Sequence, residues 1–253
     1  MTTSPLCAID TALIAALHSA RYIAALTGAG ISAESGLATF RDAQAGLWAR
    51  YDPRELATRS AFARNPKLVW DWYAWRRASV ASAQPNAGHL ALAQIEKRAR
   101  AFSLITQNVD GLHQRAGSRE VIELHGSIAR VKCSREGTIV EHWNATDDEV
   151  PRCANCGAFL RPDVVWFEEM LPASALAAAE DAARSCEVLL VIGTSAEVYP
   201  AAALPMLARK GGARVVEINP NPTPLSEHAD YVLRASAGSM LTALVDRLAF
   251  ADG

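Results

Sequence analysis

The chain is organised around the stretch Ala25-Leu-Thr-Gly-Ala-Gly-Ile-Ser-Ala-Glu-Ser-Gly36. An apolar run over residues 22–26 leads into it and predicts a short buried strand. Gly28 and Gly30 lack a Cβ, so the backbone there can lie close to a ligand. A helix that begins near Ser32 would point free N–H groups and a positive dipole end at that ligand. The stretch therefore predicts an anion site, and the usual anion at such a place is a pyrophosphate.

The glycine spacing differs from the ordinary dinucleotide fingerprint, which needs G-x-G-x-x-G. Here Gly36 lies six residues after Gly30. A strand-to-helix turn whose glycines serve geometry alone explains the same residues, so both interpretations stand at this point. The chain continues into Gly36-Leu-Ala-Thr-Phe-Arg-Asp42. This places an aromatic ring and a cation beside the expected phosphate site, which favours nucleotide binding.

The composition restricts the class of protein. A length of 253 residues, half of them apolar, suits one large domain or one domain that carries a smaller insert. The net charge is −2 and no basic cluster is evident, so we expect no specific nucleic-acid partner. No apolar run approaches the length of a membrane span, and the N-terminus lacks the pattern of a secretory signal. We therefore expect a cytoplasmic protein without a membrane partner.

Short apolar runs alternate with helical patterns along most of the chain. Strand signals cover residues 22–26, 102–106, 121–125, 188–192, 214–218 and 230–234. Helical patterns cover residues 8–20, 67–81, 86–98, 173–185, 200–210 and 238–250. This alternation argues for a parallel sheet covered on both faces. We predict a doubly wound α/β fold that binds its ligand at the carboxyl ends of the strands.

Two regions interrupt this alternation and predict a second, smaller domain. Residues 43–85 are rich in tryptophan, and residues 127–163 are polar and contain three of the five cysteines. Five cysteines do not make a disulfide framework in a chain of this size, and the pair Cys153-Ala-Asn-Cys156 suggests metal or redox chemistry. We expect the large domain to comprise residues 1–42, 86–126 and 164–253, and the small domain to comprise the two interrupting regions.

Polar residues follow several of the expected strands. Asn108 and Asp110 come after the second strand, where capping of a short helix over residues 109–115 is a sufficient alternative explanation. Gly193-Thr-Ser195 and Asn219-Pro-Asn221 end two later strands. Small and polar groups at successive strand ends are hard to explain by packing. They predict a long polar crevice of the size of a dinucleotide.

His125 ends the strand expected over residues 121–125 and would face the same crevice. Its ordinary pKa suits a general base near neutral pH, although a lone histidine is more often a satisfied core residue. His89 and His113 lie in helical stretches with no evident partner, and we interpret both as core residues.

Taken together, these motifs resemble those of the sirtuins, which are NAD-dependent protein lysine deacylases. The resemblance covers residues 20–245. The matching segments are, in chain order, Gly28-Ala-Gly-Ile-Ser-Ala-Glu-Ser-Gly36, Thr39-Phe-Arg41, Gln107-Asn-Val-Asp110, His125-Gly126, Val164-Val-Trp-Phe167, Gly193-Thr-Ser195 and Asn219-Pro-Asn221. The resemblance implies a Rossmann-like large domain, a small domain built from two insertions, and NAD between them.

The resemblance also implies roles for individual residues. His125 is similar to the general base, and Asn108 and Asp110 resemble the residues that hold the nicotinamide end. The implied NAD contacts are Ala29, Ser32, Phe40, Arg41, Gln107, Ser195 and Asn219. The neighbouring positions assigned to the same cofactor site are Gly28, Gly30, Glu34, Thr39, Trp48, Gly193, Thr194, Pro220, Asn221 and Ala237.

The implied protein substrate carries an acylated lysine. Val164-Val-Trp-Phe167 has strand propensity and resembles the edge to which the substrate peptide adds as a strand. Tyr73-Ala-Trp-Arg76 matches the Tyr-x-x-Arg of the class III subgroup, in which the pair binds the carboxylate of succinyl- or malonyl-lysine. Tyr73 and Arg76 share one face of a helix, so a surface stack or a domain contact is the plain alternative.

Two departures from the family pattern stand out. Glu168 occupies the place of the usual glycine after Phe167, which leaves the local turn and the peptide register open. In the metal module, Cys133, Cys153 and Cys156 supply three ligands, and Glu136 stands where the fourth cysteine is usual. A structural zinc site needs four ligands, so a Cys₃Glu site, a Cys₃–water site and a metal-free module are the alternatives.

The sequence thus predicts an NAD-dependent deacylase that removes succinyl or malonyl groups and also acetyl groups. One rival is mono-ADP-ribosyl transfer, which uses the same cleavage of NAD with another acceptor. The other rival is a protein that binds NAD without catalysis, against which the set of Asn108, Asp110 and His125 argues.

Overall fold

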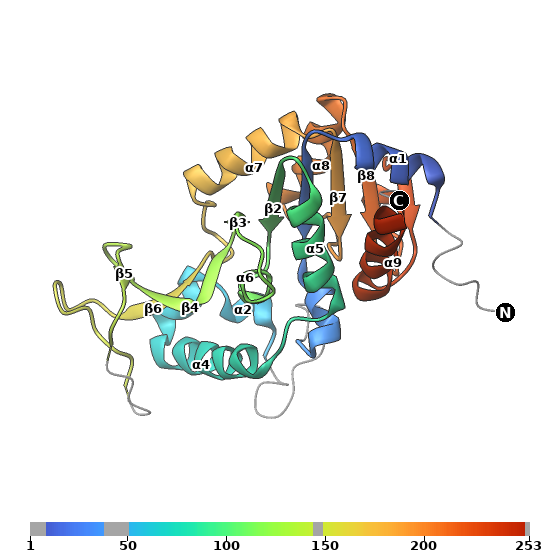
Figure 1. Ribbon diagram of the computed structural model, residues 1–253. Helices are drawn as coiled ribbons and strands as arrows, with labels where there is room; N and C mark the ends of the chain where they lie inside the picture. The colour runs from blue at the N-terminus through green and yellow to red at the C-terminus, as the bar shows by residue number, and fades with distance from the viewer. Residues whose placement is uncertain (1–8, 38–50, 144–148, 251–253) are drawn as a thin grey trace.

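A six-stranded parallel sheet forms the centre of the larger part of the molecule in the computed structural model (Figure 1). The structure describes residues 9–37, 51–143 and 149–250. The strands run in the order β3-β2-β1-β7-β8-β9. Their bounds are β1 Ile23–Thr27, β2 Phe102–Thr106, β3 Val121–Glu123, β7 Val188–Ile192, β8 Arg214–Ile218 and β9 Tyr231–Leu233. The order reverses between β1 and β7, so their carboxyl ends form the switch point at which such sheets bind ligands.

Helices cover both faces of this sheet, because strands such as β1 and β7 are buried along their whole length. One face packs on α1 (Thr11–Ser19), α5 (Ala87–Arg98) and α9 (Ala237–Phe250). The other face packs on α7 (Ala173–Ser185) and α8 (Leu204–Lys210). Figure 1 shows α5 and α9 together on one side of the sheet and α7 and α8 on the other. The shorter helices are the 3₁₀ segments η2 Ala29–Ser35, η4 Ala201–Ala203 and η5 Pro224–Glu227, and α6 Leu112–Arg115.

A second core lies beside the large sheet. It contains the antiparallel sheet β5-β4-β6, with β4 at Gly126–Cys133, β5 at Ile139–Val140 and β6 at Leu160–Val164. The helices α2 (Pro53–Leu56), α3 (Arg59–Arg64) and α4 (Pro66–Ser82) pack against it and contribute most of its aromatic side chains. Figure 1 shows α4 running below the β4–β6 pair. This second core therefore combines chain from both of the regions that interrupt the α/β alternation.

The α/β fold class is confirmed, and most elements lie where the sequence indicated. Several local expectations are wrong. The strand expected over residues 121–125 ends at Glu123, so His125 lies in the turn between β3 and the strand that begins at Gly126. The helix after β1 is a 3₁₀ segment that begins at Ala29 rather than an α-helix beginning near Ser32. The strand expected over residues 164–167 ends at Val164, and beyond it only an isolated bridge joins Phe167 to Thr58. Among the described residues, no helix is both long and apolar enough to span a membrane.

Candidate active site

The glycines after β1 pack against the backbone that follows β7, at the switch point. The N–H of Gly30 donates to the carbonyl of Gly193 at 2.8 Å, and the N–H of Gly28 donates to the carbonyl of Ile192 at 3.0 Å. A Cβ on Gly30 would lie 2.7 Å from the Gly193 oxygen, which no real contact tolerates. The two glycines therefore allow one loop to lie on the other. Their own N–H groups are used in this backbone contact, so the close approach that the missing Cβ atoms allow is, in part, that of backbone to backbone.

Ser32 is the centre of a buried hydrogen-bond cluster beside this loop. Its hydroxyl donates to Oδ2 of Asp110 at 2.7 Å and accepts from Nδ2 of Asn108 at 3.1 Å. Nε2 of His89 lies 3.3 Å from the same oxygen. Because the single hydroxyl proton goes to Asp110, His89 must donate from Nε2, and Nδ1 of its ring accepts from the N–H of Asn86 at 3.3 Å. The cluster thus fixes both side chains that follow β2.

Asp110 has two functions in this arrangement. Oδ1 accepts from the N–H of Leu112, the first residue of α6, at 2.9 Å. The N-cap residue is Gly111, which makes no side-chain cap, so Asp110 forms a turn ahead of the helix rather than the cap that the alternative predicted. Oδ2 binds Ser32 and turns the carboxylate toward the switch point. Asn108 is buried, and its N–H donates to Oγ1 of Thr106 at 3.0 Å. The turn ahead of α6 and a position in the crevice are therefore compatible.

His89 and His113 are core residues, but both have partners that the sequence did not reveal. Their rings stack edge to face with centroids 4.9 Å apart, and both are almost fully buried. Nε2 of His113 lies 2.9 Å from Oγ1 of Thr27. The Thr27 hydroxyl donates its own proton to Oγ1 of Thr106, so it accepts from His113. Burial, followed by the neighbouring His89, lowers the pKa of His113 to about 3. Both rings therefore support the site as neutral groups.

One ring nitrogen of His125, Nε2, has no hydrogen-bond partner among the residues that the structure describes. Nδ1 lies 2.8 Å from the carbonyl oxygen of Gln107, and because a carbonyl can only accept, this nitrogen carries the proton. The neutral ring therefore has an unprotonated Nε2, which is the form that a general base requires. Burial lowers the pKa of His125, while the bond to Gln107 acts in the opposite direction.

Hydrogen bonds join the polar ends of three strands. Nε2 of Gln107 donates to Oγ1 of Thr194 at 3.0 Å, and Nδ2 of Asn219 donates to the carbonyl of Thr194 at 2.9 Å. Oδ1 of Asn219 accepts from the N–H of Asn221 at 3.2 Å. Ser195 is half-buried next to this row and Pro220 is exposed. The expected crevice residues after β2, β7 and β8 are therefore brought together.

The carboxylate of Glu34, a predicted cofactor contact, is bound to the start of α9 in this structure. It accepts from the N–H of Gly238 at 2.7 Å and from the hydroxyl of Ser236 at 2.9 Å. Both donors lie at the start of α9, beside the buried Ala237. An acidic side chain at a helix N-terminus is stabilising, so Glu34 ties η2 to α9. Four assigned cofactor residues, Thr39, Phe40, Arg41 and Trp48, lie outside the described residues.

Tyr73 and Arg76 lie on α4 within the second core. Tyr73 is 1% exposed, which excludes a surface stack. Its hydroxyl oxygen accepts from Nε1 of Trp166 at 3.0 Å, so the phenolic proton stays available for another acceptor. Burial raises the pKa of Tyr73 to about 12. Burial also lowers the pKa of Arg76, whose guanidinium lies 5.0 Å from the Trp72 ring centre.

The segment after β6 is held from two sides. Arg161 is 6% exposed. Its Nη1 and Nη2 donate to the two carboxylate oxygens of Glu169 at 2.5 and 2.9 Å. Nη2 also donates to the carbonyl of Val164 at 2.7 Å. The same carboxylate accepts from the N–H of Trp166 at 2.9 Å. The sequence analysis missed this pair, because Arg161 lies in a strand that also contains Asp163 and so carried no distinct signal of burial. Val165 is half-buried between these anchors.

Glu168 keeps the turn that a glycine would make. Its φ is 73°, in the left-handed region, and its carboxylate accepts from the N–H and hydroxyl of Ser60 at 3.4 and 3.2 Å. The N–H of the exposed Phe167 donates to the carbonyl of Ala57 at 2.9 Å. The replacement of glycine therefore leaves the turn in place and adds a contact with the first turn of α3.

Four potential metal ligands meet at the end of the small sheet. The side-chain ligand atoms of Cys133, Glu136, Cys153 and Cys156 lie within 4.8 Å of one another. Sγ of Cys133 is 3.5 Å from Sγ of Cys156. Tetrahedral zinc with bonds of about 2.3 Å separates its sulfur ligands by about 3.8 Å, so the cluster fits zinc with Glu136 as the fourth ligand. The cluster is consistent with a zinc-binding part of the protein.

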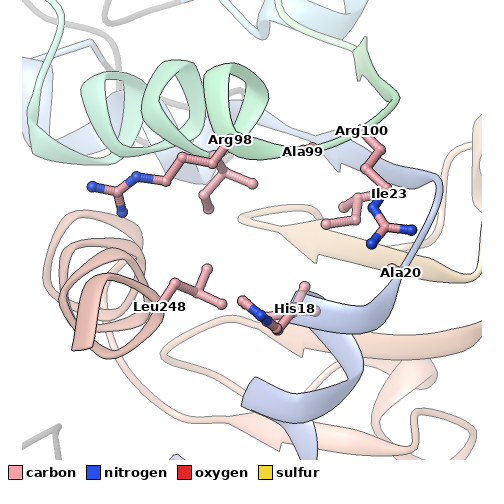
Figure 2. A pocket seen from close by; sticks show the side chains of 9 residues that line it. His18, Ala20, Ile23, Arg98, Ala99, Arg100 and Leu248 are labelled. Atoms are coloured by element: carbon pink, nitrogen blue, oxygen red, sulfur yellow. The ribbon is translucent and has the colours of Figure 1, made fainter. Parts of the chain in front are cut away.

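A pocket at the opposite end of the sheet does not belong to this site. It lies where β1 begins and is lined by residues that include His18, Ile23, Arg98 and Arg100 (Figure 2). Its volume of about 210 Å³ falls below the roughly 300–1,000 Å³ of ordinary ligand pockets. Figure 2 shows the guanidinium of Arg98 directed toward α9, where Nη1 donates to the carbonyl of Val245 at 3.1 Å.

The fold and the strand-end cluster define an α/β protein with a polar switch-point site and a separate cysteine-bearing core. Residues 28–200 match the model of the Sir2 family. The chain is 51% identical over 232 residues to NAD-dependent protein deacylase 2 of Pyrobaculum aerophilum, which covers 92% of this chain and 93% of that protein. It is 52% identical over 229 residues to the NAD-dependent protein deacylase of Ralstonia nicotianae, at 90% and 93% coverage.

Solved structures agree with these relatives. A crystal structure of a Sir2 homolog–NAD complex matches with a TM-score of 0.91 and 47% identity, and covers 97% of this chain and 96% of that one. A Sir2–p53 peptide–NAD⁺ complex matches with a TM-score of 0.84 and 30% identity, at 95% and 98% coverage. This chain belongs to the Sir2 family.

Proposed function

We propose that this protein is an NAD-dependent protein lysine deacylase that prefers acyl groups ending in a carboxylate, such as succinyl and malonyl. The substrate would be an acylated lysine of another protein, bound between the two parts that the sequence predicts as large and small domains. The names of the homologues support the NAD-dependent deacylation. The observation that carries the acyl preference is the placement of Tyr73, buried in the second core, and of the half-buried Arg76 one turn further along the same helix.

The polar strand ends support the reaction itself. NAD would supply the bond between C1′ of the ribose and nicotinamide, which would break with release of nicotinamide as the acyl oxygen of the substrate bonds to C1′. Fixed dipoles in a water-poor site favour the positive charge that develops at C1′, and Asn108 and Asp110 are held by Ser32 for this role. His125 would take the proton of the ribose 2′-hydroxyl at Nε2, because its Nδ1 is committed to Gln107.

The acyl preference follows from the chemistry of Tyr73 and Arg76. A guanidinium presents a fork of donors that matches a carboxylate, and the free phenolic proton adds one more. Trp166 fixes the Tyr73 oxygen in place, so little side-chain entropy is lost on binding. An acetyl group offers these donors no acceptor. Sites built for a polar group reject analogues that lack it, so we expect a higher kcat/KM for succinyl-lysine than for acetyl-lysine.

The test is a panel of acetyl-, malonyl- and succinyl-lysine peptides that share one sequence, incubated with and without NAD and analysed by mass spectrometry. Arg76→Met should reduce kcat/KM for the succinyl peptide. The loss should correspond to about 2–5 kcal/mol of transition-state stabilisation, the range for breaking a buried charge pair. Deacetylation should stay equal or improve. Lys67→Met is the matched control, because it removes an exposed cation from the same helix. Proportional loss of both activities in a folded Arg76→Met protein would make Arg76 structural.

The same experiment separates the rival functions. In a deacylase, nicotinamide release and acyl removal occur in equal amounts, and both stop when NAD is absent. With radiolabelled NAD, label that stays on the acceptor protein would favour mono-ADP-ribosyl transfer. Binding of NAD without nicotinamide release would favour a non-catalytic protein.

We also propose that the cysteine cluster holds one structural zinc ion through Cys133, Cys153, Cys156 and Glu136. The separation of their ligand atoms supports this set. The ion would hold β4 and β6 together at the end that is remote from His125.

A further inference from the structure

A second buried carboxylate lies next to the strand-end row, at the end of β8. Glu217 is 1% exposed and precedes the last residue of that strand. It accepts from the hydroxyls of Thr223 and Ser226, the latter at 2.7 Å, and from Nη1 of Arg234 at 3.0 Å. Its oxygens are thus occupied by donors from the loop that follows the strand. Glu217 is therefore committed to this loop rather than available to bind a ligand directly.

Arg234, just after β9, also binds the loop that follows β8. Nη1 donates to the carbonyl of Asn219 at 3.3 Å and to the carbonyl of Asn221 at 3.1 Å. Nη2 donates to the hydroxyl of Ser226 at 2.6 Å. One guanidinium therefore binds both asparagines' backbones, a loop hydroxyl and Glu217. Only an arginine has enough donors in a fixed plane to do this.

The loop is also connected to the centre of the site. Asn219 donates to the carbonyl of Thr194, and Thr194 accepts from Gln107. Hydrogen bonds thus join the ends of β9, β8, β7 and β2 in one row. In the sheet order, β8 and β9 lie on the far side of the switch point from β3, which leads into His125.

We infer that Glu217 and Arg234 are positioning residues for the co-substrate: they hold the loop of Asn219–Asn221 in the shape that binds the end of the dinucleotide farthest from the reacting C1′. The inference rests on the proposed function, because it names that co-substrate as NAD. Neither residue is expected to touch the reacting atoms. They act through the backbone carbonyls and side chain of the loop.

The test compares Glu217→Gln and Arg234→Lys with wild type. The amide of glutamine presents donors where the carboxylate accepted, and an ammonium cannot span all four acceptors of Arg234. We expect KM for NAD to rise about tenfold, which corresponds to about 1.4 kcal/mol, while kcat and the KM for the acyl peptide stay within about twofold. By calorimetry, Kd for ADP-ribose should rise by the same factor, and inhibition by nicotinamide should not change.

Glu227→Gln and Arg214→Lys are the matched controls. Glu227 is exposed in η5 of the same loop, and Arg214 is exposed at the opposite end of β8. Both controls should keep the wild-type KM for NAD. If Glu217→Gln does not fold, Ser226→Ala carries the test, since it removes one neutral partner and should raise KM for NAD about two- to threefold.

The outcomes separate this inference from the proposed function. An active wild type whose variants keep their KM for NAD overturns the positioning role alone. A fall in kcat with unchanged KM, or equal loss toward NAD and peptide, also overturns it, because a purely structural role gives that result. A wild type that releases no nicotinamide overturns the proposed function, while ADP-ribose calorimetry still tests the loop.

Discussion

Removal of Glu169 should destabilise the protein far more than the loss of an ordinary surface charge. In Glu169→Ala, the guanidinium of Arg161 loses the two carboxylate bonds at 2.5 and 2.9 Å. What remains is the carbonyl of Val164 and the face of Trp166, whose ring centre lies 3.3 Å from the guanidinium carbon. Neither neutralises the charge, and Nε of Arg161 already lacks a partner among the described residues.

The magnitude follows from the burial of the remaining cation. The side chains of Arg161 and Glu169 are 7% and 16% exposed, so water replaces little of the lost interaction. Breaking such a pair by removing one partner costs about 3–5 kcal/mol. For a chain of this size, each kcal/mol lowers Tm by roughly 2–4 °C, so we expect Tm to fall by about 6–20 °C. In contrast, the exposed pair of Glu180 and Arg184 should contribute at most about 0.5 kcal/mol.

Thermal and urea unfolding of Glu169→Ala, with Glu180→Gln as control, measures this difference. Arg161→Met in the Glu169→Ala background should recover part of the loss, because it removes the buried unpaired charge. The effect also has a pH signature. Arg161 holds the pKa of Glu169 below its usual range, so the carboxylate stabilises the fold above the unfolded value near 4.3 and stops doing so as pH falls through the folded value. The difference in free energy of unfolding between wild type and Glu169→Ala should therefore become smaller below about pH 4. A loss under 1 kcal/mol at pH 7 would refute the reasoning.

Two further predictions concern the base and the metal. Because burial lowers the pKa of His125, the fall of kcat/KM on the acid side of the pH profile should lie below pH 6.5. His125→Ala should lose about 10²-fold or more in turnover, while calorimetry should still detect NAD binding. Near-wild-type turnover of this variant would show that His125 is not the general base. Elemental analysis of protein purified without chelator should find about one zinc per chain. Cys153→Ala should lower both the zinc content and Tm. If the wild-type protein contains no zinc and treatment with a chelator leaves its Tm unchanged, the module folds without metal.

The sheet could be predicted because buried parallel strands are apolar along their whole length. Phe102–Thr106, Val188–Ile192 and Arg214–Ile218 were expected at the bounds that the structure has. The carboxyl ends of parallel strands meet at one edge, so the grouping of Asn108, Thr194 and Asn219 followed from their positions alone. The structure confirms this proximity, and their roles toward NAD stay predictions.

Contacts between distant segments could not be predicted, because a single sequence carries no information on which residues pair. Glu34 binds the N–H of Gly238, which is 204 residues away, and this contact with the start of α9 was not evident from the sequence. His89 lacked an evident partner because Ser32, 57 residues earlier, supplies it. Gly30 shows the same ambiguity in another form. A missing Cβ allows close approach to a ligand or to backbone, and only the position of Gly193 shows that backbone lies there.

The buried pair of Arg161 with Glu169, and the pair of buried Glu217 with the exposed Arg234, both bind backbone groups, which their contribution to stability alone does not explain. For Arg161 and Glu169, desolvation of both charges offsets most of their attraction, so apolar residues of similar size would stabilise the fold as well. What apolar residues cannot do is bind particular backbone groups. Arg161 and Glu169 bind the carbonyl of Val164 and the N–H of Trp166, in the segment expected to meet the acyl peptide. Arg234, paired with Glu217, binds the carbonyl of Asn219, in the loop expected to meet NAD. Each pair therefore fixes the backbone of one expected substrate-binding segment, which favours a positioning role for both.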